Sequence, residues 1–172
     1  QQFLPALERA GAAAKASLGE RFAAPLEQSA RTLSPSDFGF HNALRDGDGS
    51  LVFLDFEYFG WDDPAKMISD FLWHPRSTMA EHLKDHFARR LAASFGDAPG
   101  FQARLDAVFP LFGLKWCMIL LNEFRPENLA RRRFASGSTE ETEAVLSAQL
   151  TKAENTLKRV NQGPSFSDRY LT

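Results

Sequence analysis

A turn-forming stretch between two short apolar runs is the sequence feature that most constrains the fold. Residues 43–45 and 51–54 flank an Asp-Gly-Asp-Gly sequence, which is typical of a β-hairpin because glycine accepts the positive φ of tight turns. The second run is apolar at consecutive positions, which predicts a strand buried on both faces. The run ends at Asp55, with Glu57 close behind, and carboxylates at the end of a buried strand need partners.

Outside the hairpin, apolar residues recur at helical spacing. They predict helices over 3–18, from Pro25 to about 33, from Pro64 to about 73, over 78–95, over 101–134 with breaks or kinks at Pro110 and Pro126, and from Ser138 to about 160. Asp62 or Asp63 can cap the helix at Pro64, and Ser138 with Glu141 has the spacing of a capping box. The polar tail after Gly163 is expected to fray.

These patterns predict one mainly helical α+β domain over residues 1–172. The chain carries 20 basic and 22 acidic side chains, a net charge of −2, which argues against nucleic-acid or anionic-lipid partners. The basic run 131–133 is interpreted as a solvated face. The longest apolar stretch, 107–121, contains Pro110 and Lys115 and is shorter than the roughly 20 residues of a membrane span. We therefore expect neither a nucleic-acid partner nor a membrane span.

Cysteine and histidine residues give only weak indications of metal chemistry. Cys117 is the single cysteine, which excludes an internal disulfide, favours a cytoplasmic protein and suggests a small buried side chain. His82 and His86 share one helix face, a spacing that fits either zinc or a solvated surface. His74 precedes Pro75 and is expected to end a helix. His41 could contact phosphate or pack its loop.

Three oxygen-bearing side chains flank the predicted hairpin. Asp37 and Asn42 precede its first strand, and Asp55 ends its second. Because a hairpin brings its two ends together, we expect the three to surround one small volume. Asn42 and Asp55 suit Mg²⁺, which takes one or two protein carboxylates together with waters and substrate phosphates. Asp37 would then orient a hydroxyl group and take its proton, as phosphoryl transfer requires.

The segments that carry these residues resemble one kinase family. They are similar to motifs of the aminoglycoside phosphotransferase and choline kinase family, whose members are small-molecule kinases with a protein-kinase-like fold. The similar segments are Ser34-Pro35-Ser36-Asp37-Phe38-Gly39-Phe40-His41-Asn42, Leu51-Val52-Phe53-Leu54-Asp55-Phe56-Glu57 and Gly60-Trp61-Asp62-Asp63-Pro64-Ala65.

The resemblance implies the C-terminal lobe of a kinase that transfers the γ-phosphoryl group of ATP to a hydroxyl group of a small acceptor. By this resemblance Asp37 matches the catalytic-loop aspartate, whereas Asn42 and Asp55 match the two positions that bind Mg²⁺ and, with it, ATP. Glu57 falls in the Asp-Phe-Glu pattern of the family. Its implied role is either to contact the substrate or to hydrogen-bond the residues that bind the metal ion.

Trp116 and Glu123 are further candidates for the acceptor site. They lie on the long predicted helix that borders the acceptor pocket in similar kinases. An aromatic face beside a carboxylate would suit an amino or ammonium group, although core packing explains Trp116 equally well. The acceptor stays open among aminoglycosides, choline, sugars and amino alcohols.

Two departures from the family pattern bear on activity. Pro35 and Ser36 stand where the family has His-Gly, so other contacts must hold the catalytic loop. No Gly-rich loop or strand lysine precedes the motif, so we expect the N-terminal lobe to be missing and this chain alone to be inactive. Two other interpretations stay open: a pseudokinase or ligand-binding module without catalysis, and a helical interaction domain whose Asp and Asn residues form turns.

Overall fold

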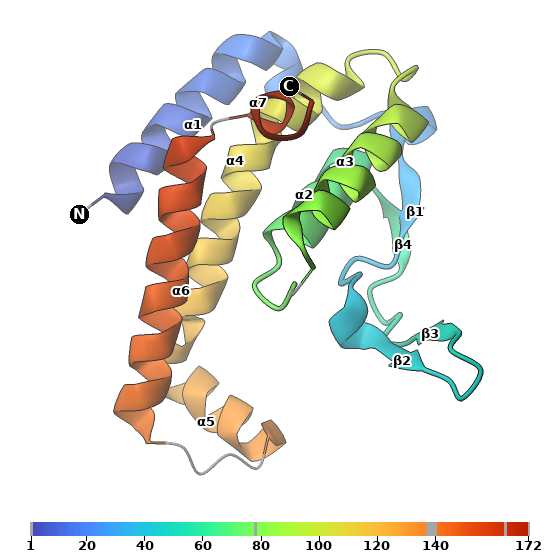
Figure 1. Cartoon of the computed structure of the whole chain (residues 1–172). Helices are drawn as coiled ribbons and strands as arrows, with labels where there is room; N and C mark the ends of the chain where they lie inside the picture. Colours follow the sequence, from blue (N-terminus) through green and yellow to red (C-terminus); the bar gives the residue numbers. More distant parts are fainter. Residues whose placement is uncertain (1, 78, 137–140, 164, 172) are drawn as a thin grey trace.

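A computed structural model describes residues 2–77, 79–136, 141–163 and 165–171. The fold is mainly helical and of the α+β class, as the sequence predicted, and it has two small antiparallel sheets where the sequence predicted a single hairpin. Helices α1, α4 and α6 run alongside one another, α2 and α3 lie on the other side of α4, and the β2–β3 hairpin projects away from them (Figure 1). The helices are α1 (Phe3–Leu18), α2 (Pro64–Trp73), α3 (Glu81–Phe95), α4 (Phe101–Leu120), α5 (Pro126–Ser136), α6 (Thr142–Gln162) and α7 (Phe166–Tyr170). The strands are β1 (Thr32–Ser34), β2 (Ala43–Arg45), β3 (Leu51–Phe53) and β4 (Gly60–Asp62).

The start of α2 follows the predicted capping chemistry. The Asp63 carboxylate accepts a hydrogen bond from the backbone N–H of Ala65 at 2.8 Å, and Pro64 occupies the first helical position. Proline is favoured there because its missing N–H would have no helical partner. Arg104 of α4 also contacts both oxygens of Asp63, with Nε 3.0 Å from Oδ2 and Nη2 3.1 Å from Oδ1. One carboxylate therefore caps α2 and joins it to α4.

Helix α4 is the centre of the core. It packs against α1, α2 and α6 and stays helical through Pro110, whereas the break predicted at Pro126 is confirmed by the short 3₁₀ turn Leu121–Phe124 and the start of α5. Trp73 of α2 is 1% exposed, and its indole N–H donates to the carbonyl of Phe109 at 2.9 Å. A Cβ added at Gly113 would lie 2.5 Å from Val160 and 2.9 Å from Trp73. The absence of a side chain at Gly113 therefore allows the three helices to approach closely.

One helix in the described part of the chain is long and apolar enough, by length and composition, to cross a membrane. It comprises residues Phe101–Phe124, which are α4 and the turn that follows. The same test is met by the core helix of a globular domain, and α4 packs against three other helices. The expectation of no membrane association stays a prediction.

The helix predicted from Pro25 is wrong. Residues Gln28–Ala30 form a single 3₁₀ turn, and the chain then enters β1, which pairs antiparallel with β4 in the register Thr32↔Asp62, Leu33↔Trp61 and Ser34↔Gly60. The hydrogen-bonding partners of β1 come from a segment about 30 residues further along the chain. Local periodicity carries no information about such a distant pairing.

The frayed tail predicted after Gly163 is also wrong. Ser165 accepts a hydrogen bond from the N–H of Asp168 at 3.0 Å and so caps α7. Phe166 is 0% and Tyr170 1% exposed, and their ring centroids lie 5.6 and 5.9 Å from that of Phe109. The tail is ordered because these two aromatic side chains complete the core.

The hairpin is confirmed, but its second strand is not buried on both faces. β2 and β3 pair as predicted, with Ala43 opposite Phe53, whereas Leu51 and Val52 are 48% and 47% exposed. The sheet has only these two strands, so little else covers its faces. Of the predicted capping box, Ser138 lies outside the described residues, and Glu141 precedes α6 without a side-chain cap hydrogen bond.

Candidate functional site

Asp37 lies in the loop between β1 and β2, and local hydrogen bonds shape that loop. The buried Ser34 hydroxyl accepts a hydrogen bond from the N–H of Ser36 at 3.1 Å, and the N–H of Asp37 donates to the carbonyl of Pro35 at 2.8 Å. Ser36 has a φ of 65°, a left-handed conformation that few non-glycine residues adopt. This tight turn leaves the Asp37 carboxylate partly exposed, at 45%.

The structure brings Asn42 against Asp37. The side-chain amide nitrogen of Asn42 donates to the carbonyl oxygen of Asp37 at 2.9 Å and to its carboxylate Oδ2 at 3.3 Å. A 3₁₀ turn over Phe40–Asn42 places the two residues in contact. Because the amide nitrogen of Asn42 donates both of these hydrogen bonds, the amide oxygen is the atom that can contact a further group.

The backbone of Asp55 lies at the same end of the hairpin as Asn42. The N–H of Leu54 donates to the carbonyl of Asn42 at 2.8 Å, which extends the β2–β3 ladder to the residue just before Asp55. Asp55 then turns out of the strand with a φ of 63°, and its side chain is exposed. Within the described residues, no hydrogen bond joins its carboxylate to Asp37 or Asn42.

Asp55 and Glu57 give this end of the hairpin a negative potential. The charge of Glu57 and its hydrogen bond to Tyr58 raise the pKa of Tyr58, and the charge of Asp55 contributes in the same direction. A tyrosine pKa rises in this way because neighbouring negative charges disfavour the phenolate. The exposed carboxylates would attract a cation to the strand end.

Two stacked histidines hold the Asp37 carboxylate, a contact that the sequence did not predict. The Nε2 atoms of His41 and His74 lie 3.1 and 3.7 Å from Oδ1 of Asp37, and the two rings stack with centroids 4.0 Å apart. His74 follows α2, whose end it was predicted to mark. The stack supplies contacts to the loop that Pro35 and Ser36 cannot make.

The same three side chains are spaced closely enough to be a metal-ligand group, since their ligand atoms lie within 4.8 Å of one another. A hydrogen bond argues against this use: the backbone N–H of Arg76 donates to Nδ1 of His74 at 3.2 Å. The proton of a neutral His74 ring must then be on Nε2, facing Asp37. A nitrogen that carries a proton has no lone pair for a metal ion, so we interpret the cluster as support for Asp37.

We expect His74 to make folding stability depend on pH. Burial, with a smaller contribution from His41, lowers the pKa of His74 from its ordinary 6.5 to about 4. Between these values the unfolded chain binds a proton that the folded chain does not, so the free energy of unfolding is fully retained above pH 6.5 and declines as the pH falls toward 4. His74→Gln should flatten this decline in urea unfolding at about pH 7 and about pH 5.

The exposed His82 supplies the matched control for that experiment, because His82→Gln removes a histidine from α3 without touching the cluster. If His74→Gln retains the full pH dependence of the parent chain, another group is responsible for it. His82 and His86 themselves are both exposed, and the metal-ligand group found among the described residues does not include them.

A second polar cluster ties the loop that carries Asp37 to the helices. Asp70 of α2 is 8% exposed and forms ion pairs with Lys66 and Lys115, while the indole N–H of Trp116 donates to its Oδ1 at 3.0 Å. Lys66 also pairs with Asp62 and donates to the Ser36 hydroxyl at 3.3 Å. Trp116 therefore has a defined orientation, with its ring edge-on to His74 at 4.6 Å between centroids.

Trp116 and Glu123 line one pocket of about 170 Å³. They do not share one continuous α-helix, because α4 ends at Leu120 and Glu123 lies on the 3₁₀ turn Leu121–Phe124. Glu123 is 6% exposed, pairs with Arg132 of α5 and accepts from the side-chain N–H of Gln149 at 2.8 Å. His74 lines the same pocket. Sequence reasoning missed Gln149, since one glutamine on an amphipathic helix gives no signal.

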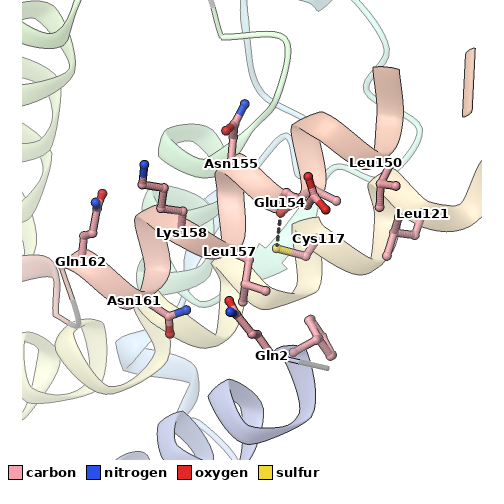
Figure 2. Close-up of a pocket in the computed structure, with 12 residues that line it drawn as sticks. Gln2, Cys117, Leu121, Leu150, Glu154, Asn155, Leu157, Lys158, Asn161 and Gln162 are labelled. Carbon is pink, nitrogen blue, oxygen red and sulfur yellow. Dashed lines mark hydrogen bonds between the residues drawn. The ribbon is translucent and has the colours of Figure 1, made fainter. Parts of the chain in front are cut away.

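A larger groove of about 980 Å³ lies between α1, α4 and α6. Figure 2 shows its wall, where the Cys117 thiol points to the backbone of α6 while the side chains of Lys158 and Gln162 point away from Cys117. The Cys117 thiol donates to the carbonyl of Ala153 at 3.5 Å, and burial raises its pKa to about 11. Cys117 is thus the small buried side chain that was expected. Asp37, Asn42 and Asp55 do not line this groove.

Comparison with known proteins adds nothing to this geometry: no family model matches the chain, and no curated protein or solved structure matches it.

Proposed function

We propose that the chain is the C-terminal lobe of a small-molecule kinase that transfers the γ-phosphoryl group of ATP to a hydroxyl group. The observation that carries this proposal is the contact between Asp37 and Asn42 at the end of the hairpin that also carries Asp55. Phosphoryl transfer needs a carboxylate for the attacking hydroxyl group beside oxygen ligands for Mg²⁺. The same arrangement weighs against the interpretation of these residues as scattered turn formers.

In this proposal each residue has a distinct task. The exposed Asp37 carboxylate orients the acceptor hydroxyl group and receives its proton, and the Nε2–H of His41 and the amide of Asn42 hold that carboxylate in place. The Asn42 oxygen and Asp55 would hold Mg²⁺, which when bound neutralises charge on the nucleotide phosphates. Glu57 would strengthen the negative potential at the strand end.

The apolar side chains around the hairpin support a nucleotide-covering lobe as the partner of this chain. Large apolar side chains of the segment 33–61 are between 45% and 69% exposed. They are Leu33, Phe40, Leu44, Leu51, Val52, Leu54, Phe56, Tyr58, Phe59 and Trp61. Exposed apolar surface of this extent marks an interaction site, and it lies next to the proposed Mg²⁺ position. We propose that ATP binds between the two lobes in the cytoplasm and that the isolated chain transfers no phosphate.

One observation favours a second candidate, a ligand-binding module or pseudokinase. Pro35 stands where the kinase family that this segment resembles has a histidine, and Asp37 has contacts that would persist in an inactive pocket. A kinase and a ligand-binding module would both bind Mg²⁺, so the formation of phosphorylated product distinguishes the two functions.

Mn²⁺, a paramagnetic ion that shares the preference of Mg²⁺ for oxygen ligands, tests the proposed metal site in the chain itself. In ¹H–¹⁵N NMR spectra, substoichiometric Mn²⁺ should broaden the resonances around Asn42 and Asp55 first. Asp55→Asn should weaken that effect at least about tenfold in Mn²⁺ concentration, because the only charged ligand of the pair is removed. The remote, exposed Asp97→Asn serves as the control.

Broadening that starts elsewhere, or that survives unchanged in the Asp55→Asn variant, would contradict the metal site. Excess Mg²⁺ should reverse the broadening in the unaltered chain, which shows that the two ions share the position.

A further inference from the structure

Lys66, in the first turn of α2, contacts the residue just before Asp37. Its Nζ atom donates to the hydroxyl oxygen of Ser36 at 3.3 Å. The same Nζ atom pairs with Asp62 and lies 3.6 Å from Oδ2 of Asp70. An ammonium group has three N–H donors and no acceptor. Lys66 therefore meets one oxygen atom for each of its donors: one from the loop, one from β4 and one from α2.

The stability of α2 does not explain a lysine at this position. The N-terminus of a helix carries a partial positive charge, which disfavours a cation in the first turn. Asp63 already caps the helix, so Lys66 adds nothing to the cap. The Lys66 side chain is only 28% exposed, and removing a charged group from water is unfavourable unless it is paired. The three contacts of the ammonium group must offset both of these costs.

Both carboxylate partners of Lys66 are fixed by further contacts. Oδ1 of Asp62 accepts a hydrogen bond from the backbone N–H of the following residue at 2.8 Å. Oδ1 of Asp70 pairs with Lys115 of α4. Because β4, which ends at Asp62, pairs with β1 (Figure 1), the ammonium group is anchored to the sheet as well as to the helices. It therefore offers the Ser36 hydroxyl group a donor in a fixed position.

Ser36 is the strained residue of the loop. Its φ of 65° is the left-handed conformation, which a side chain with a Cβ makes unfavourable. Its backbone N–H donates to the hydroxyl of Ser34 at 3.1 Å, and its own hydroxyl accepts from Lys66. Such strain persists only where the surrounding contacts over-determine it. Because Ser36 directly precedes Asp37, its backbone angles set the direction in which the Asp37 carboxylate leaves the loop.

We propose that Lys66 is a positioning residue for Asp37: its hydrogen bond to Ser36 keeps the left-handed turn that presents the Asp37 carboxylate. Within the described part of the chain, no hydrogen bond or ion pair joins Lys66 to Asp37 itself, so the effect passes through Ser36. Only the consequence for catalysis rests on the proposed function. The effect of Lys66 on the turn does not depend on it.

Amide hydrogen exchange in the 172-residue chain tests the turn without ATP. The probe is the N–H of Ser36, which is hydrogen-bonded within the turn. Lys66→Met removes the ammonium group and should accelerate exchange of this N–H at least about tenfold, because the turn opens locally once the contact is lost. Lys115→Met is the matched control, since it removes the other ammonium group from Asp70 and leaves the Ser36 contact in place. It should change the exchange rate by less than about twofold.

Two substitutions at Ser36 separate the hydroxyl contact from the backbone strain. Ser36→Ala removes the hydroxyl group and keeps the Cβ, whereas Ser36→Gly removes both and adopts a positive φ without steric cost. In the full-length protein with ATP, Lys66→Met and Ser36→Ala should each lower kcat about tenfold with little change in the KM for the acceptor. Ser36→Gly should stay closer to the parent. In the Ser36→Gly background, Lys66→Met should lower kcat by less than about twofold, because the two residues act through one contact.

The exchange and the kinetic experiments can fail separately. Equal acceleration of the Ser36 N–H in Lys66→Met and Lys115→Met rejects the positioning role, and so does a loss of kcat in Lys66→Met that is as large in the Ser36→Gly background as in the parent. Exchange that follows the expectation in a full-length protein that forms no phosphorylated product rejects the kinase function and leaves Lys66 as the residue that positions Asp37.

Discussion

Replacing Asp37 with asparagine is expected to lower kcat by about 10²–10⁴-fold, the range that general acid–base catalysis contributes. Asparagine keeps the size of the side chain and can still contact Asn42, but it cannot take the proton of the acceptor hydroxyl group. The measurement is product formation from ATP by the full-length protein, in which the chain is assembled with the nucleotide-covering lobe that we propose. The KM for the acceptor should change little, since the lost interaction belongs to the transition state.

Folding must be intact for that result to be informative. Asp37 is 45% exposed, so the free energy of unfolding of the variant should stay close to that of the parent. Asp97→Asn, an exposed substitution far from the hairpin in sequence, should leave kcat unchanged. Near-normal kcat in the Asp37→Asn protein would reject Asp37 as the base, and an inactive parent protein that still binds the nucleotide would favour the pseudokinase.

Replacing Tyr170 with alanine is expected to reduce the free energy of unfolding by about 3–5 kcal/mol, the range for deleting a buried aromatic side chain. The Tyr170 ring is 1% exposed and packs against Phe109 and Phe166, so truncation leaves a cavity in the core. A loss of this size is a large part of the 5–15 kcal/mol that stabilises a typical domain. Urea unfolding followed by circular dichroism measures it.

Tyr170→Phe is the matched control, because it keeps the ring and removes only the hydroxyl group. That hydroxyl group is buried without a hydrogen-bond partner among the described residues, and its burial raises the pKa of Tyr170 to about 12. Since an unsatisfied buried polar group is costly, the phenylalanine variant should be as stable as the parent or slightly more stable. A substantial loss in Tyr170→Phe would show that the hydroxyl group has a partner.

The candidate site was partly predictable because several of its residues lie close together in the sequence. Asp37 and Asn42 are five residues apart, and the Asp-Gly turn brings the strand end at Asp55 back toward them. The contact of His74 with Asp37 was not predictable, since His74 arrives on the end of α2. The sequence predicted Glu123 as a site residue beside Trp116. Its hydrogen-bond partner Gln149 comes from α6, and nothing in the sequence pattern indicated that residue.

Sequence alone determined those features of this protein whose energetics are local: the hairpin at Asp46–Ser50, an aspartate cap at the start of α2 and the amphipathic face of α1. Tertiary structure decided the β1–β4 pairing, the order of the tail around Phe166 and Tyr170, and the contact between Lys66 and Ser36. The physical reason is that turns and caps are satisfied by neighbouring atoms of the chain, whereas strand pairing and burial depend on partners that only folding brings together.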